Sequence, residues 1–287
     1  MFLWQQIGSS WYGTYGDHII KFTLSNNEPN SNGKDNRFEF CSYPEIKGWE
    51  RSVFRLDDDI KKVLSALSND ALVGEAIKKY PGLRLMRQEP HQCFFSFACA
   101  SNSNITMIRR MLLNLSKKFG AKLIFDGNEF YTFPSVKSLN KATLGELQSC
   151  GVGYRAKTIK AVAEHLTCGN LDINSLIRSE YEEAKEEILK VYGLGNKIAD
   201  CILLFSLEKL EAFPIDVWIF KAISRYYYWL LEQNDYSNLN KLSTSDSLSG
   251  SQYRVISQFL RRYFGKYSGY AQQFIYYHMR EMAGKTW

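Results

Sequence analysis

The sequence predicts a mostly helical protein with a small β-containing N-terminal subdomain, which is an α+β class. In residues 1–56, two segments alternate apolar and polar side chains, as half-buried strands do. From Leu56 onward, apolar residues recur every three or four positions, which is the spacing of one helix face. The chain has 287 residues, 45% of them hydrophobic and 23% charged, as is typical of a globular protein.

The elements follow from these patterns. Strands are predicted over residues 17–24 and 37–43, and the polar residues 26–36 between them predict a turn or loop. The acidic residues 57–59 suit the start of a helix, and Pro90 suits the first turn of another. Later helices are predicted to begin near residues 105, 144, 155, 182, 197, 217, 253 and 271, and the Ser- and Asn-rich residues 234–252 predict a loop or connector.

These elements divide the chain into four segments. Residues 1–56 are the β-containing subdomain, and residues 57–132 are the first part of a helical domain. Residues 133–214 contain a helix-hairpin-helix motif at about 185–208. Residues 215–287 are C-terminal helices that we expect to return to the first helical domain.

Composition, charge and cysteine spacing limit the kind of protein that this sequence can encode. The balance of 36 basic against 30 acidic residues gives a net charge of +6, which permits a nucleic-acid partner without requiring one. The six cysteines form no Cys-x-x-Cys pair and show no zinc spacing with histidine, so no zinc site is indicated. Neither a signal peptide nor a membrane span is predicted, which favours an intracellular protein with no membrane partner.

The segment VYGLGNKIADCILLF, residues 191–205, places a Gly-Leu-Gly turn between two predicted helices. Gly193 and Gly195 allow backbone angles closed to other residues, and the amides of such a turn can bind a phosphate. A simple helix C-cap is the alternative interpretation. Lys197 then lies in a first helical turn, where the dipole disfavours a cation by roughly 0.3–1 kcal/mol. It is either a solvated lysine or an amine whose neutral, nucleophilic form is favoured.

Two further residues strengthen the second interpretation. Cys201 lies four residues after Lys197 and therefore on the same helix face. Asp216 lies inside the apolar run FPIDVWIF, where an unpaired carboxylate is costly. Asp216 can cap the helix that starts at Val217, and a rigidly held carboxylate can also stabilise a cationic intermediate.

In this order the motifs resemble the 8-oxoguanine DNA glycosylase/AP lyase family of the helix-hairpin-helix (HhH-GPD) DNA glycosylase superfamily. The matching stretches include LRLMRQEPHQCFFSFACASNSNI, FPSVKSL, GVGYRAK, YGLGNKIADCILLF, FPIDVWIF and GYAQQFIYY, and they cover residues 83–278. Residues 1–56 match the family poorly.

The resemblance implies a role for each matching residue. Lys197 is the Schiff-base nucleophile and Asp216 the essential aspartate. Cys201 and Tyr276 enclose the flipped base, and Gln272 hydrogen-bonds its Watson–Crick edge. The residues expected at the DNA are Asn102, Met107, Tyr154, Arg155, Gly193 and Gly195. Taken singly, several of these could be ordinary turn or helix residues, but their joint occurrence in family order favours the functional interpretation.

Three departures from the family pattern are visible. Met107 stands where many relatives carry an arginine that contacts the cytosine opposite the lesion. Trp218 stands where a histidine is common. A Gly-Gln-Ser-Phe-Arg-Trp stretch that helps relatives to distinguish the oxidised base is absent from the N-terminal part. No cysteine follows Cys201, which excludes the iron–sulfur branch of the superfamily. The resemblance implies no metal and no cofactor for catalysis, although the hairpin carbonyls could hold a structural cation.

The resemblance therefore predicts a bifunctional repair enzyme that excises 8-oxoguanine from double-stranded DNA and cleaves the abasic strand by β-elimination. Relaxed specificity for the opposing base and a monomeric state are expected. Two alternatives remain open from the residues. One is a glycosylase of the same fold for another damaged purine, and the other is a non-catalytic helix-hairpin-helix DNA-binding protein.

Overall fold

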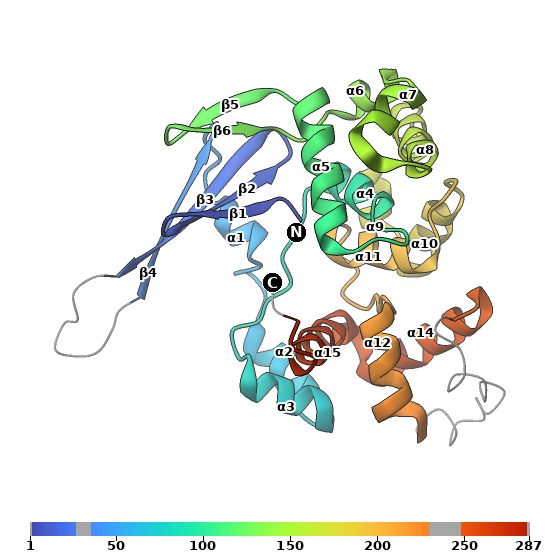
Figure 1. The fold of residues 1–287 in the computed structure, drawn as a ribbon. Coiled ribbons are helices and arrows are strands. Elements are labelled where there is room, and N and C mark those ends of the chain that lie inside the picture. Colours follow the sequence, from blue (N-terminus) through green and yellow to red (C-terminus); the bar gives the residue numbers. More distant parts are fainter. Residues whose placement is uncertain (1, 27–35, 230–247, 286–287) are drawn as a thin grey trace. The chain divides into compact units, whose positions relative to one another are not determined.

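The computed structural model describes residues 2–26, 36–229 and 248–285 (Figure 1). The chain divides into two compact units. Unit 1 comprises Met1–Phe54, Met86–Ile173 and Lys190–Gly193. Unit 2 comprises Arg55–Leu85, Asn174–Leu189 and Leu194–Trp287. Each unit is thus assembled from three stretches of chain, and the finer division into four segments stays a prediction.

Unit 1 contains the predicted N-terminal sheet, which confirms the α+β class. It is antiparallel, with strands in the order β1 (Trp4–Ile7), β2 (Ser10–Tyr15), β3 (His18–Asn26) and β4 (Asn36–Tyr43). The two predicted strands correspond to β3 and β4, whereas β1 and β2 were not predicted. Asn26 and Asn36 were expected in a loop, but they pair with each other as the ends of β3 and β4. The rest of that predicted loop lies outside the described residues.

Both faces of the sheet are covered at its centre. Ile19 and Ile20 are neighbours on β3, so their side chains point to opposite faces, yet both are fully buried. Ile20 packs with Trp49 and Val53 of α1 (Trp49–Val53). Ile19 packs with Tyr12 and Phe130. The half-buried alternation predicted for this strand therefore does not hold at these two positions.

The face of the sheet that carries Ile19 is covered by a hairpin that was not predicted. It is formed by β5 (Lys122–Phe125) and β6 (Asn128–Tyr131). Its turn residues Asp126 and Gly127 have φ of 51° and 73°, as a two-residue hairpin of this kind requires. The Asp126 carboxylate accepts hydrogen bonds from Tyr12 Oη at 2.9 Å and Lys21 Nζ at 2.5 Å, which attach the turn to the sheet.

The remaining elements of unit 1 are helical. Pro90 lies in the first turn of its helix, as predicted, and the Glu89 side chain caps that helix by accepting from the amides of His91 and Gln92. These elements are α4 (Pro90–Ala98), α5 (Ile105–Phe119), α6 (Val136–Lys141), α7 (Leu144–Leu147), η1 (Gln148–Val152) and α8 (Arg155–Thr167).

Unit 2 is helical in its described part. Its elements are α2 (Ile60–Leu67), α3 (Ala71–Lys79), α9 (Ile173–Arg178, whose first residue belongs to unit 1), α10 (Tyr181–Leu189), α11 (Asn196–Ser206), α12 (Val217–Ala222), η2 (Ile223–Tyr227), α14 (Gly250–Phe264), η4 (Gly265–Tyr267) and α15 (Ser268–Met282). Among the described residues, no helix combines the length and the apolar character needed to cross a membrane.

Helix α14 begins three residues earlier than predicted. Ser249 accepts a hydrogen bond from the Gln252 amide, and the Gln252 side chain accepts one from the Ser249 amide, which is a capping box. This box places Gly250–Gln252 in the helix, although they were expected in a loop. Residues 234–247 of the predicted loop lie outside the described residues.

Candidate active site

The helix-hairpin-helix motif consists of α10, a turn, and α11. Gly193 has φ +83°, and a Cβ atom built there would lie 2.1 Å from Thr158 Oγ1. Gly195 has an ordinary φ of −90° and no atom within 4 Å of such a Cβ. The turn therefore requires glycine at position 193 only.

This difference predicts opposite outcomes for two matched substitutions. Gly193→Ala should lower the free energy of unfolding by about 2 kcal/mol or more, because it adds backbone strain and a contact with Thr158. Gly195→Ala should cost about 1 kcal/mol or less, since it changes only a helix N-cap. Urea unfolding of both variants measures the difference, and equal losses would contradict the assignment.

Helix α11 carries the predicted nucleophile. Gly195 is its N-cap residue and supplies no side-chain hydrogen bond, and Lys197 is the second helical residue and half-buried. Cys201 lies one turn further on and is buried. Burial raises the pKa of the Cys201 thiol to about 11, although Lys197 lowers it through its charge and a hydrogen bond. The predicted proximity of the two side chains is confirmed, and the thiol is neutral at pH 7.

Asp216 is the N-cap of α12, as predicted. Its Oδ1 accepts hydrogen bonds from the amides of Trp218 at 3.0 Å and Ile219 at 2.9 Å. Burial raises the pKa of the carboxyl, while these amides and the charges of Lys197 and Arg280 act in the opposite direction. Asp216 is thus a fixed carboxyl group close enough to Lys197 for their charges to interact.

Helix α15 supplies the remaining pocket candidates and packs against α12. Gln272 is 3% exposed, and its Nε2 donates a hydrogen bond to the Pro214 carbonyl at 2.9 Å. Its Oε1 accepts one from Gln273 Nε2 at 2.6 Å, so the orientation of the amide is fixed. Tyr276, one turn later, is half-buried, and its pKa is raised by burial and by the charge of Asp216.

A buried network that the sequence analysis missed supports this group. Asp200, fully buried on α11, accepts hydrogen bonds from Tyr181 Oη at 2.6 Å, Lys185 Nζ at 2.8 Å and Tyr253 Oη at 2.7 Å. Tyr253 Oη in turn accepts from the Ile215 amide at 3.1 Å. The network therefore connects the helix of Lys197 to the residue before Asp216. An acidic residue inside the apolar run IADCILLF was the available indication.

The other candidate residues lie in unit 1. Arg155 donates from Nε at 2.9 Å to the Ser101 carbonyl, to which its Nη2 also donates, and from Nη2 to the Asn102 carbonyl at 3.0 Å. Tyr154 Oη donates to the Ser101 carbonyl at 3.2 Å, and the ring lies 4.6 Å from the Arg155 guanidinium. Asn102 has φ +46°, in the left-handed region that asparagine tolerates. The structure brings these three residues together around one loop.

Met107 lies in the first turn of α5, which Asn104 caps by accepting from the Met107 amide at 2.9 Å. Met107 is 44% exposed. A replacement there can therefore change surface chemistry without disturbing the core.

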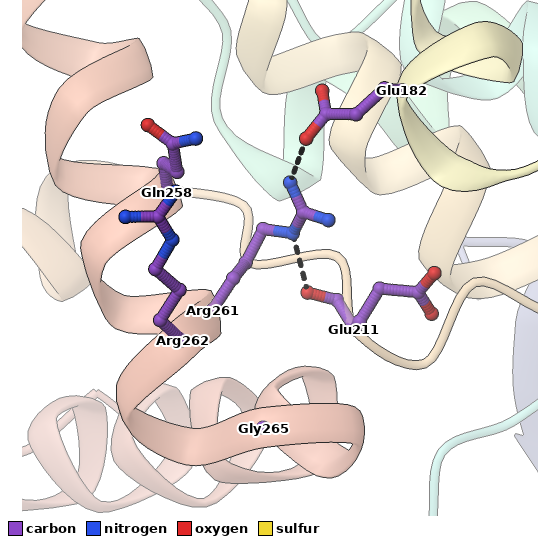
Figure 2. A pocket seen from close by; sticks show the side chains of 6 residues that line it. All are labelled: Glu182, Glu211, Gln258, Arg261, Arg262 and Gly265. Atoms are coloured by element: carbon purple, nitrogen blue, oxygen red, sulfur yellow. Dashed lines mark hydrogen bonds and ion pairs between the residues drawn. The ribbon is translucent and has the colours of Figure 1, made fainter.

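A surface pocket of about 260 Å³ in unit 2 contains none of the predicted site residues. Figure 2 shows Arg261 in this pocket, donating to Glu182 Oε1 at 2.6 Å and to the Glu211 carbonyl at 3.2 Å. The Arg261 guanidinium also lies 3.3 Å from the centroid of the Tyr181 ring. Arg261 therefore packs against Tyr181, which is a member of the Asp200 network. The pocket is lined by Glu182, Glu211, Gln258, Arg261, Arg262 and Gly265.

All six cysteines are free thiols, and four of them are buried. Within the described ranges, no group of three or more His, Cys, Asp or Glu side chains is arranged to hold a metal ion.

Several known proteins are similar to this chain in sequence and in fold. Residues 1–94 match the N-terminal domain of 8-oxoguanine DNA glycosylases. This match corrects the expectation that residues 1–56 match the family poorly. The alternation of apolar and polar residues in this region is common to many half-buried strands, so it did not indicate this family.

Among solved structures, the chain is similar to the 8-oxoguanine glycosylase/lyase of Clostridium acetobutylicum, determined with double-stranded DNA containing cytosine opposite 8-oxoguanine. The TM-score is 0.81 at 28% identity, covering 99% of this chain and 89% of that one. The 3-methyladenine DNA glycosylase of Archaeoglobus fulgidus, 16% identical with a TM-score of 0.70 over 98% of this chain and 91% of that one, shares the fold.

Among curated proteins, the N-glycosylase/DNA lyase OGG1 of Arabidopsis thaliana is 29% identical over 96% of this chain and 73% of its own length. A probable N-glycosylase/DNA lyase of Methanothermobacter thermautotrophicus is also 29% identical, over 79% of this chain and 73% of its own length. Residues 95–245 match the HhH-GPD family, and the chain therefore belongs to the HhH-GPD superfamily of base excision DNA repair proteins.

Proposed function

We propose that this protein excises 8-oxoguanine from double-stranded DNA and then cleaves the abasic strand as a lyase. The observation that carries the proposal is the group formed by Lys197, Cys201 and Asp216, with Gln272 and Tyr276 on the adjacent helix α15. A nucleophile, a fixed carboxylate, an amide and an aromatic ring are what removal of one extruded base requires. The similar glycosylase/lyases support the choice of lesion.

The chemistry assigns one role to each group. The neutral Lys197 amine attacks the anomeric carbon while the bond to the base breaks, and the base leaves with the bonding electrons. Asp216 stabilises the positive charge that develops on the sugar. The amine nitrogen then loses a proton, the bond between the anomeric carbon and the ring oxygen breaks, and that oxygen takes up a proton, which gives an open-chain imine. Removal of a proton from C2′ of this imine breaks the bond from C3′ to oxygen and expels the 3′ phosphate by β-elimination. Cys201 and Tyr276 enclose the base, and Gln272 hydrogen-bonds its edge.

The test is reduction with borohydride during reaction with a duplex that contains one 8-oxoguanine. Hydride transfer to the imine leaves a stable protein–DNA adduct, which gel electrophoresis detects. The same duplex with guanine serves as the control. Adduct with a duplex containing an alkylated purine but none with 8-oxoguanine would favour the alternative glycosylase. DNA binding without any base release would indicate a non-catalytic protein.

We further propose relaxed specificity for the opposing base, because Met107 offers no hydrogen-bond donor to a cytosine. In this structure the Arg155 guanidinium is directed at the backbone carbonyls of Val152, Ser101 and Asn102. Single-turnover excision on four duplexes that differ only opposite the lesion should show a weak preference for cytosine. A preference above about a hundredfold would contradict this, because two intact contacts could account for it.

Met107→Arg should restore part of the preference, mainly by slowing reaction opposite adenine and guanine. One base contact is worth about 1–3 kcal/mol of discrimination, so we expect a change of about 5- to 150-fold. Met107→Leu is the matched control, since it keeps the size and adds no donor. Identical profiles for the arginine and leucine variants would show that position 107 does not face the opposing base.

The proposed substrate places the protein where a cell keeps its DNA. Its location in the cytoplasm with the nucleoid, or in the nucleus, stays a prediction.

A further inference from the structure

Arg280 is a buried cation to which the sequence analysis gave no role. It follows Tyr276 by one turn of α15 and Gln272 by two, so the three residues share one side of the helix. Arg280 is 9% exposed. Its Nη1 donates a hydrogen bond to Tyr276 Oη at 2.9 Å, and the guanidinium carbon lies 5.6 Å from the centroid of the Tyr276 ring.

Arg280 also acts on Asp216, the N-cap of the helix that packs against α15. Its charge and that of Lys197 both lower the pKa of the Asp216 carboxyl, against the effect of burial. Cys201 on α11 and Tyr276 on α15 are two further titratable groups in electrostatic contact with this carboxyl. Burial raises the pKa of both, so neither carries a charge at pH 7.

The two cations behave differently during the proposed reaction. Lys197 must be neutral when it attacks, and it then no longer favours the ionised form of Asp216. The guanidinium of arginine keeps its proton at every pH of interest. At the moment of attack, the charge of Arg280 therefore still lowers the pKa of Asp216, which burial raises. The hydrogen bonds from the amides of Trp218 and Ile219 act in the same direction as Arg280.

We propose that Arg280 is a positioning residue that holds the Tyr276 ring as a wall of the base pocket and keeps Asp216 ionised while Lys197 is neutral. The consequence for the reaction rests on the proposed function. The effect on Asp216 can be measured in the protein without DNA.

The test compares two substitutions of Arg280. Arg280→Lys keeps the charge, whereas Arg280→Gln removes it and retains an N–H donor for Tyr276. Both are made in Lys197→Gln, which imitates the neutral lysine. With the aspartate carboxyl carbons labelled with 13C, the Asp216 resonance is identified by its loss in Asp216→Asn and titrated by NMR. The glutamine variant should titrate about one pH unit or more above its parent, and the lysine variant close to it.

The kinetic counterpart is single-turnover base release as a function of pH, with Lys197 intact. Because Asp216 must be ionised, activity is lost as the pH falls through its pKa. Arg280→Gln should move this loss to higher pH, and Arg280→Lys should not. Tyr276→Phe removes only the acceptor of the hydrogen bond, so it should weaken binding of the lesion duplex while leaving the pH profile in place.

Coinciding Asp216 titrations in the lysine and glutamine variants would overturn the inference, as would an equal loss of rate at every pH. Arg280→Met provides a second charge-free variant. If neither charge-free variant folds while the lysine variant does, the charge serves folding, and the inference is wrong. If the wild type released no 8-oxoguanine, the proposed function would fail, yet the titration would still decide the role of Arg280 toward Asp216.

Discussion

Lys197→Gln should abolish the covalent protein–DNA adduct and lower base release by on the order of 10³-fold or more. Glutamine has a similar length to lysine but no amine that can attack the sugar. The Cys201 side chain and the apolar faces of α11 do not change, so the fold should be retained. Borohydride trapping and single-turnover release on an 8-oxoguanine duplex measure the two effects.

The matched control is Lys61→Gln, on the exposed surface of α2. It removes the same charge outside the proposed site and should leave the adduct in place. An undiminished adduct with Lys197→Gln would assign the nucleophile to another residue. Loss of the adduct in both variants would point to a general effect of charge on DNA binding.

Asp216→Asn should keep DNA binding and lower base release by on the order of 10²–10³-fold, the size of the loss when one preorganised electrostatic contact is removed. Asparagine caps a helix about as well as aspartate, so the hydrogen bonds to Trp218 and Ile219 should persist. The change therefore separates the charge of Asp216 from its capping role. Binding and single-turnover rates measured on the same duplex give the two quantities.

Asp59→Asn is the control for capping, because Asp59 caps α2 by accepting from the Lys62 amide at 3.1 Å. Both variants should unfold at nearly the same urea concentration as the wild type. If Asp216→Asn retained the full rate of base release, Asp216 would be a helix cap and nothing more.

The parts of the fold that sequence could predict are those set by local rules. Helical spacing placed α5 and α11, and acidic or proline residues placed the starts of α2 and α4. The hairpin β5–β6 was missed although its Asp126-Gly127 turn is a local feature, because helical patterns flank it on both sides. The burial of both faces of β3 at Ile19 and Ile20 could not be predicted, since it depends on the distant hairpin and α1.

In the candidate site, too, the residues set by local rules could be predicted and those set by packing could not. Lys197 and Asp216 lie at helix starts, and Cys201 follows Lys197 by one helical turn, so local spacing suggested the chemistry of all three. Asp200 was missed because its hydrogen-bond partners come from other helices. Arg280 was missed because its effect on Asp216 depends on the packing of α15 against α12. A single charged residue in an apolar helix indicates that a partner exists, and only the packing identifies it.

Helix α15 follows α11 and α12 in the chain, so a ribosome synthesises the residues of the proposed base pocket at different times. Lys197 is incorporated about 75 residues before Gln272. At 5–20 residues per second, roughly 4–15 s pass between them. Until α15 has been synthesised, a nascent chain carries the lysine and Asp216 but neither Gln272 nor Tyr276, and α12 lacks the helix that packs against it. A polypeptide released early would therefore hold the reactive amine without the groups proposed to select its base, and its uncovered apolar surface would expose it to proteolysis.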